Sequence, residues 1–131
     1  MRSLRVACIP LLLCSVACTV STVARIAPAP PGRLPDDEAE LIAAFRHGAA
    51  EAGLKCPDTS ADGNDLAFCN NWRSGTTQNV EAYLHRTEGA LAISVAANTR
   101  GQACAVFHSV YRRVVEVTGR DRVQPDSRCA R

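Results

Sequence analysis

Two adjacent segments of alternating side chains constrain the fold of this chain more than any other feature. Residues 79–87 place apolar side chains on one face and polar ones on the other, which is typical of a half-buried strand. After a tight turn at residues 88–89, residues 90–97 alternate again. The second face of 90–97 carries the small residues Ala92, Ser94 and Ala96, so we expect this strand to lie centrally in a sheet.

Two further segments have helical periodicity. From Ala103 to Val117, apolar residues recur at i, i+3, i+4, i+7, i+11 and i+14, which a helix gathers on one side and a strand scatters over both faces. Their valines favour strand by propensity, but the period predicts a helix that ends at Gly119. The earlier helix begins at Asp36 or Asp37 and ends near Ala52.

The remaining elements complete an α-β-β-β-α order with a possible last strand. The sequence predicts a strand around residues 66–72 and a short edge strand at residues 122–124, before Pro125. Antiparallel hairpins with both helices on one face predict an α+β fold. This is a two-layer sandwich whose antiparallel sheet has three to four strands.

The first 18 residues have the pattern of an export signal. Arg2 and Arg5 precede a short apolar run at residues 6–14, too brief for a transmembrane helix. Small residues at 15–17 and then Cys18 resemble the lipobox of bacterial lipoprotein precursors. The resemblance implies that residues 1–17 are a removed signal peptide and that Cys18 carries acyl chains such as palmitate. Ordinary secretion after the same small residues, or an uncleaved anchor, are the alternatives.

Cysteine number favours the lipoprotein interpretation. The chain has seven cysteines, and Cys8 and Cys14 leave with the signal. Lipidation of Cys18 leaves an even four, which suits disulfide bonds in an oxidising periplasm. Four cysteines allow three pairings, and we favour the following two bonds: Cys56–Cys69 and Cys104–Cys129.

The organisation expected after the signal is a tether and one domain. Residues 18–35 contain the lipidated cysteine and a proline- and alanine-rich stretch, interpreted as a solvated linker of up to roughly 50 Å. Residues 36–131 form a small disulfide-stapled globular domain. The chain has 15 basic and 13 acidic residues, and loss of Arg2 and Arg5 makes these numbers equal. We therefore expect no nucleic-acid partner.

No metal or cofactor site is expected. Asp58, Ser60, Asp62 and Gly63 match the start of an EF-hand calcium loop, but its twelfth position is Cys69, so an Asx-rich turn is favoured.

The positions of the histidines also predict no metal site, and the sequence lacks two common catalytic motifs. The residues His47, His85 and His108 lack metal-ligand spacing and are interpreted as surface residues. We find no Gly-x-Ser-x-Gly or Cys-x-x-Cys motif, although a Ser-His-Asp site needs no sequence proximity and stays open.

Two groups of residues are candidates for binding. Trp72 and Arg73 begin a polar loop, and such pairs are enriched at interface hot spots; alternatively, Trp72 packs beneath the helices. His108, Arg112 and Arg113 form a stripe on the second helix that suits an acidic partner or anionic glycan; alternatively, it is a solvated helix face.

These observations predict a non-enzymatic binding module in the bacterial envelope. Its lipid would hold it in the membrane. The resemblance to lipoproteins, in which the residue after the cysteine influences sorting, implies an outer-membrane location facing the periplasm, because Thr19 rather than Asp follows Cys18. The expected partner is a protein or another envelope component. The alternatives are an immunity or inhibitor lipoprotein against a toxin or lysozyme-like enzyme, and an accessory subunit or assembly factor of an envelope complex.

Overall fold

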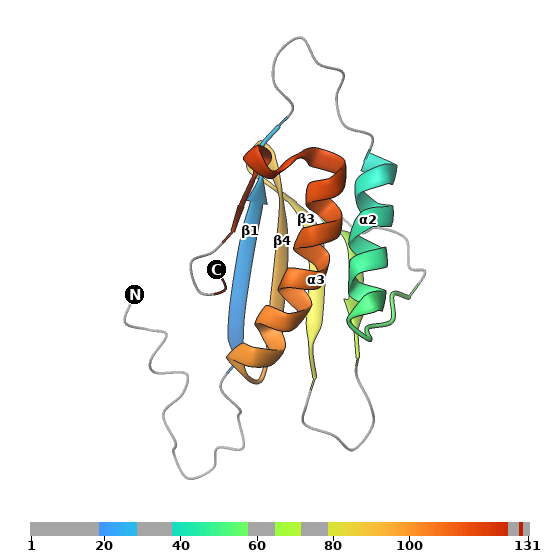
Figure 1. The fold of residues 1–131 in the computed structure, drawn as a ribbon, viewed down its shortest axis with the longest axis vertical. Helices are drawn as coiled ribbons and strands as arrows, with labels where there is room; N and C mark the ends of the chain where they lie inside the picture. Colours follow the sequence, from blue (N-terminus) through green and yellow to red (C-terminus); the bar gives the residue numbers. More distant parts are fainter. Residues whose placement is uncertain (1–18, 29–37, 58–64, 72–78, 126–128, 130–131) are drawn as a thin grey trace, which may run out of the picture.

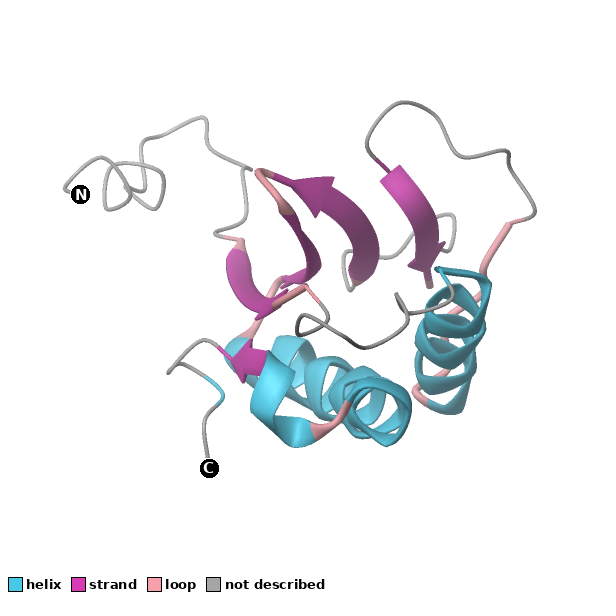
Figure 2. Ribbon diagram, turned by 90° about the horizontal axis from the view of Figure 1, so that it is seen from above, coloured by secondary structure: helices cyan, strands magenta, loops and turns pink. Residues whose placement is uncertain are grey.

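The computed structural model describes residues 19–28, 38–57, 65–71, 79–125 and 129. In chain order the elements are β1 (Val20–Ile26), α2 (Glu38–Glu51), β2 (Asp65–Asn70), β3 (Glu81–Thr87), β4 (Ala90–Ala97), α3 (Arg100–Thr118), the 3-10 turn η1 (Arg120–Arg122) and β5 (Val123–Pro125). All neighbouring strands are antiparallel, in the order β2-β3-β4-β1-β5. Both helices cover one face of this sheet (Figures 1 and 2), which confirms the predicted α+β sandwich.

The strand β1 corrects the prediction of a tether over residues 18–35. Residues 20–26 pair along their whole length with β4, and three of them pair with β5 on the other side. Thr22, Ala24 and Ile26 are at most 2% exposed, because they point towards the helices. Alternating burial of a segment rich in β-branched residues is what stabilises a strand. The sheet formed by the described residues therefore has five strands, and residues 29–35 of the predicted linker lie outside the described part of the chain.

The β3–β4 hairpin and the two helices match their expected positions. Gly89 has a φ of 69° in the turn, a conformation that glycine adopts without strain. Thr99 caps α3 by accepting a hydrogen bond from the Gln102 amide, and Gly119, at a φ of 95°, follows its last turn. The predicted edge strand is β5, which begins at Val123.

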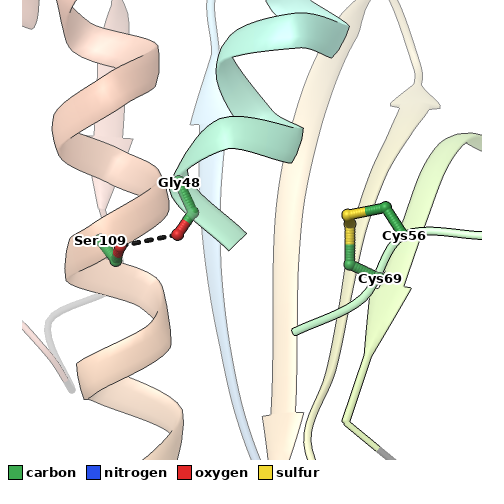
Figure 3. The surroundings of a disulfide bond; sticks show 4 residues. All are labelled: Gly48, Cys56, Cys69 and Ser109. Carbon is green, nitrogen blue, oxygen red and sulfur yellow. Dashed lines mark hydrogen bonds between the residues drawn. A yellow bond between two sulfur atoms is a disulfide. The ribbon is translucent and has the colours of Figure 1, made fainter. Parts of the chain in front are cut away.

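The core lies between the helices and the inner face of the sheet. The helices contribute Leu41, Phe45, Ala49, Ala103, Phe107, Val110 and Val114, and the strands contribute Ala24, Ile26, Ala67, Cys69, Ala82, Leu84, Ile93 and Val95. The helices approach most closely at Gly48, whose carbonyl accepts a hydrogen bond of 2.7 Å from the Ser109 hydroxyl (Figure 3).

Two disulfide bonds fasten loops to this core. Cys56 pairs with Cys69 of β2, beside the antiparallel bridge between Lys55 and Asn70 (Figure 3). Cys104 of α3 pairs with the buried Cys129. These pairs are the favoured ones of the three that four cysteines allow.

Candidate binding surface on the outer face of the sheet

The outer face of the sheet, which points away from the helices, is not packed against any described helix or strand (Figure 2). Because strand residues alternate between faces, it carries the odd-numbered residues of β1 and β3 and the even-numbered residues of β4. The register aligns Tyr83, Ser94 and Val23 across three strands. Val23, at 40% exposure, is the one large exposed apolar side chain among the described residues. This face of the sheet is therefore left uncovered by the described helices.

An aromatic pair lies on the outer face at β2 and β3. The ring centroids of Phe68 and Tyr83 are 4.9 Å apart. The strand β2 is irregular between Asp65 and Ala67, and beyond this irregularity Phe68 lies opposite Tyr83.

The hydroxyl of Tyr83 is engaged with a neighbouring carboxylate. It donates to Glu81 Oε1 at 3.2 Å. Burial raises the pKa of Tyr83, and the negative charges of Glu81 and Asp65 add to this effect. Tyr83 is therefore a hydrogen-bond donor that stays neutral at physiological pH.

A histidine and a serine meet on the same face. His85 Nε2 lies 2.9 Å from Ser94 Oγ, within the range for a base and a nucleophile. Asp65 is opposite His85 in the register. Among the described residues, however, no carboxylate hydrogen-bonds the histidine ring, so the third contact of a Ser-His-Asp site is missing there. We interpret the pair as a cross-strand hydrogen bond.

A polar cleft of about 160 Å³ lies at one end of the outer face, where β1 and β3 begin and β4 ends; we call this the Thr19 end. Its lining residues are Thr19, Asn79, Glu81, Ala96, Ala97 and Asn98. Asn79 precedes β3 and Asn98 follows β4, so the register of the hairpin brings both amides together. Asn79 Oδ1 is buried and has no hydrogen-bond partner among the described residues.

The candidate loop that begins with Trp72 and Arg73 leaves the sheet at the same end. Both residues lie outside the described part of the chain. The base of the loop is closed by Asn71 and Val80, since the Val80 amide donates to Asn71 Oδ1 at 2.7 Å and the Asn71 amide donates to the Val80 carbonyl. Asn79, at the end of this loop, lines the cleft.

The predicted cationic stripe on α3 is partly engaged with α2. Arg113 hydrogen-bonds both carboxylate oxygens of Glu51, and Arg112 reaches Glu51 at 3.4 Å. These contacts hold the pKa of Glu51 at about 2, with the Arg113 hydrogen bond as the largest cause. His108 is exposed, and its ring is 5.8 Å from that of Phe107. The two arginines therefore join the helices, in addition to facing solvent.

Other residues considered from the sequence give no assembled site. His47 lies 3.7 Å from Glu51 and is 58% exposed. The EF-hand-like segment and Cys18 lie outside the described residues. Within the described ranges, no three His, Cys, Asp or Glu side chains are close enough to hold a metal ion. No described helix is long and apolar enough to cross a membrane.

Two features of the structure were missed from the sequence. Glu51 links the helices, but nothing in a linear pattern pairs it with residues of α3. The cleft needs β1, whose alternation from Val20 to Ile26 is visible but stands directly before a proline-rich run. Recognising that alternation would have placed Thr19 beside the end of β4.

No family model, curated protein or solved structure matches this chain.

Proposed function

We propose that the protein is a small bacterial envelope lipoprotein that acts as a non-enzymatic binding module in the periplasm. The outer face of the sheet is its binding surface. The observation that carries the proposal is which cysteines form disulfide bonds and which one does not. The two disulfides consume all four cysteines after Cys18, so in a chain that has lost residues 1–17 the lipobox-like cysteine is the one left for an acyl chain to modify.

The early start of β1 changes how such an anchor acts. Only Thr19 separates Cys18 from Val20, and two extended residues span at most about 7 Å. Acyl chains on Cys18 would therefore hold the Thr19 end of the sheet at the bilayer surface instead of tens of ångströms above it. Two or more chains are required for stable anchoring, since one alone binds only marginally.

The anchor is tested by comparing the full-length precursor with its Cys18→Ser variant in a bacterium that processes lipoproteins. We expect the wild-type protein to partition into detergent and to carry acyl mass on its first residue. The variant should stay in the aqueous phase. A wild-type protein with an unmodified Cys18 at its N-terminus would contradict the proposal and indicate ordinary secretion.

The binding surface is tested by placing a photo-crosslinking side chain at Val23 on the outer face. Arg112 is the matched control, because it is also exposed but lies on the opposite layer. We expect a specific cross-linked partner from position 23 and not from position 112. Cross-linking from position 112 alone would assign recognition to the helices.

A further inference from the structure

We propose that the Thr19 end of the molecule is a docking surface for an anionic phospholipid bilayer, contacted by Lys55 and Arg100. This inference rests on the proposed lipid anchor and adds an electrostatic contact between the protein itself and the headgroups. A lipid chain attaches a protein to a bilayer of any charge, whereas cationic side chains beside the chain add a preference for anionic headgroups.

The register of the sheet places Lys55 at the anchored end. Lys55 forms an antiparallel bridge with Asn70, and the strand register continues this row across β3 and β4 to Ser21 of β1. Ser21 is three residues after Cys18, so this row begins at most about 11 Å from the anchor point. The Lys55 side chain is exposed, because the bridge uses only its backbone N–H and C=O.

Arg100 lies at the same end of the molecule, in the helical layer. β4 ends at Ala97, which pairs with Val20, and α3 begins at Arg100 after a connection of two residues. Figure 1 shows β1 and α3 beginning at this common end. Arg100 is exposed, and within the described ranges neither Arg100 nor Lys55 forms an ion pair. Both charges therefore face solvent, where lipid phosphates can approach them.

Two carboxylates near the Thr19 end are engaged by other groups. Glu51, at the end of α2, accepts hydrogen bonds from Arg113 on both carboxylate oxygens. Glu81 is half-buried and accepts the hydroxyl of Tyr83 at 3.2 Å. Because Arg113 compensates Glu51, the two exposed cations outweigh the charge of Glu81 at this end.

At the opposite end, cations stand beside carboxylates. α2 begins there, and its Glu38 pairs with Arg86 near the end of β3. Arg120 is followed directly by Asp121, and Glu88 is exposed in the β3–β4 turn. An anionic bilayer would meet these carboxylates if it approached the opposite end, so the charges favour contact through the Thr19 end.

The experiment couples one synthetic acyl chain to the Cys18 thiol of a chain that starts at Cys18 and keeps its two disulfides. One acyl chain binds a bilayer only marginally, so an electrostatic contribution changes the measured partition. Vesicles of phosphatidylcholine are compared with vesicles of equal parts phosphatidylcholine and phosphatidylglycerol. We expect about tenfold stronger partition into the anionic vesicles at low salt, and loss of this preference at high salt. Equal partition into both kinds of vesicle would overturn the inference.

Matched double variants separate this surface from net charge. Lys55→Gln with Arg100→Gln should remove most of the preference for anionic vesicles and leave thermal stability unchanged, because both side chains are exposed. Arg25→Gln with Arg120→Gln removes the same charge from exposed side chains nearer the other end, and should keep the preference. An equal loss in the two double variants would assign the effect to net charge and overturn the inference.

Lys55 also reports its own contact with the bilayer, because it is the one lysine of the chain. A water-soluble amine-acylating reagent is applied to the fully bound protein, and labelling of Lys55 is measured by peptide mass spectrometry. We expect Lys55 to react several-fold more slowly on anionic vesicles than on phosphatidylcholine vesicles. Equal labelling rates would show that Lys55 does not contact the headgroups.

The result is separable from the test of the proposed function. The acyl chain used here is synthetic, so equal partition would overturn the docking surface and leave natural acylation of Cys18 to be decided by its own experiment. An unmodified Cys18 in the bacterium would reject the lipoprotein, and with it the membrane as the partner of this surface.

Discussion

At the crossing of the two helices, Gly48 leaves no room for a side chain. A β-carbon built there would lie 2.6 Å from Val110 Cα and 2.7 Å from the Ser109 carbonyl oxygen, both of which belong to the backbone of α3. The hydrogen bond from the Ser109 hydroxyl to the Gly48 carbonyl depends on the same close approach.

We therefore expect Gly48→Ala to lower the free energy of unfolding by about 1–3 kcal/mol through overpacking. Gly101→Ala is the control, because a β-carbon at that position in α3 meets open space and should stabilise by roughly 0.5 kcal/mol. Urea denaturation measures both. Equal stability of the two variants would show that the helices separate at little cost.

Two buried threonines differ in how their hydroxyls are satisfied. Thr22 Oγ1 has no partner among the described residues, whereas the Thr118 hydroxyl donates to the Val114 carbonyl at 3.0 Å. We expect Thr22→Val to stabilise the protein by about 1 kcal/mol, and Thr118→Val to destabilise it by about the same amount. Thermal unfolding of the two variants checks the opposite signs; destabilisation by Thr22→Val would mean that its hydroxyl has a partner.

Glu51 makes stability depend on pH. Its pKa falls from 4.5 to about 2 in the folded protein, chiefly because Arg113 hydrogen-bonds its carboxylate. A lowered folded-state pKa stabilises the protein above pH 4.5, and that contribution is lost as the pH falls towards 2.

The expected result is a steeper fall in the urea midpoint of wild type than of Glu51→Gln between pH 4.5 and 2. Glu38→Gln removes an exposed carboxylate that is paired with Arg86, and it should lower the free energy of unfolding less than Glu51→Gln does at neutral pH. Parallel pH profiles of wild type and Glu51→Gln would contradict the role given to Glu51.

Among the elements, β1 has the greatest influence on whether the sheet forms. It separates β4 from β5, and its end is fixed by Arg122, whose guanidinium donates twice to the Ala27 carbonyl. A chain that starts at Asp36, the domain boundary that the sequence suggests, would expose the edge of β4 and leave β5 without its partner.

We expect the 36–131 fragment to lack the dispersed NMR spectrum of a folded protein, whereas a chain that starts at Cys18 retains it. A cooperative thermal transition of the fragment at the parent temperature would show that β1 is dispensable.

The elements that the sequence predicted share strong local periodicity. The hairpin was clear from alternation and from Gly89, and α3 was clear because its valines fall on one side despite their strand propensity. β1 was missed because the polar Thr22 on its inner face and the apolar Val23 on its outer face weaken its alternation, and because prolines follow. The cleft could not be predicted, since it joins three strands whose register depends on β1.

At the scale of the whole molecule, two covalent links hold the C-terminal residues and one internal segment to the same core. The Cys104–Cys129 bond ties the C-terminal residues to α3, and the Cys56–Cys69 bond ties the segment after α2 to β2. A core of this size is marginal, so these links contribute a large part of the stability.

Replacing Cys104 and Cys129 together with alanine should lower the free energy of unfolding by about 3 kcal/mol, as expected for closing a loop of this length. The Cys56 and Cys69 pair, which closes a shorter loop, should give a slightly smaller loss. Denaturation under non-reducing conditions measures the free energy of unfolding of both variants. An unchanged denaturation midpoint of the Cys104 and Cys129 variant would contradict a stabilising role for the bond that ties the C-terminal residues to α3.

The place of β1 also limits how fast the chain can fold. Its residues emerge before those of the other described strands during synthesis or export, yet Val20 pairs with Ala97 and Ile26 with Val123 of β5. Such pairings give a high contact order. Closing these long loops lowers the entropy of the chain before the stabilising contacts form. Folding is therefore expected to be completed only after nearly the entire polypeptide has been released.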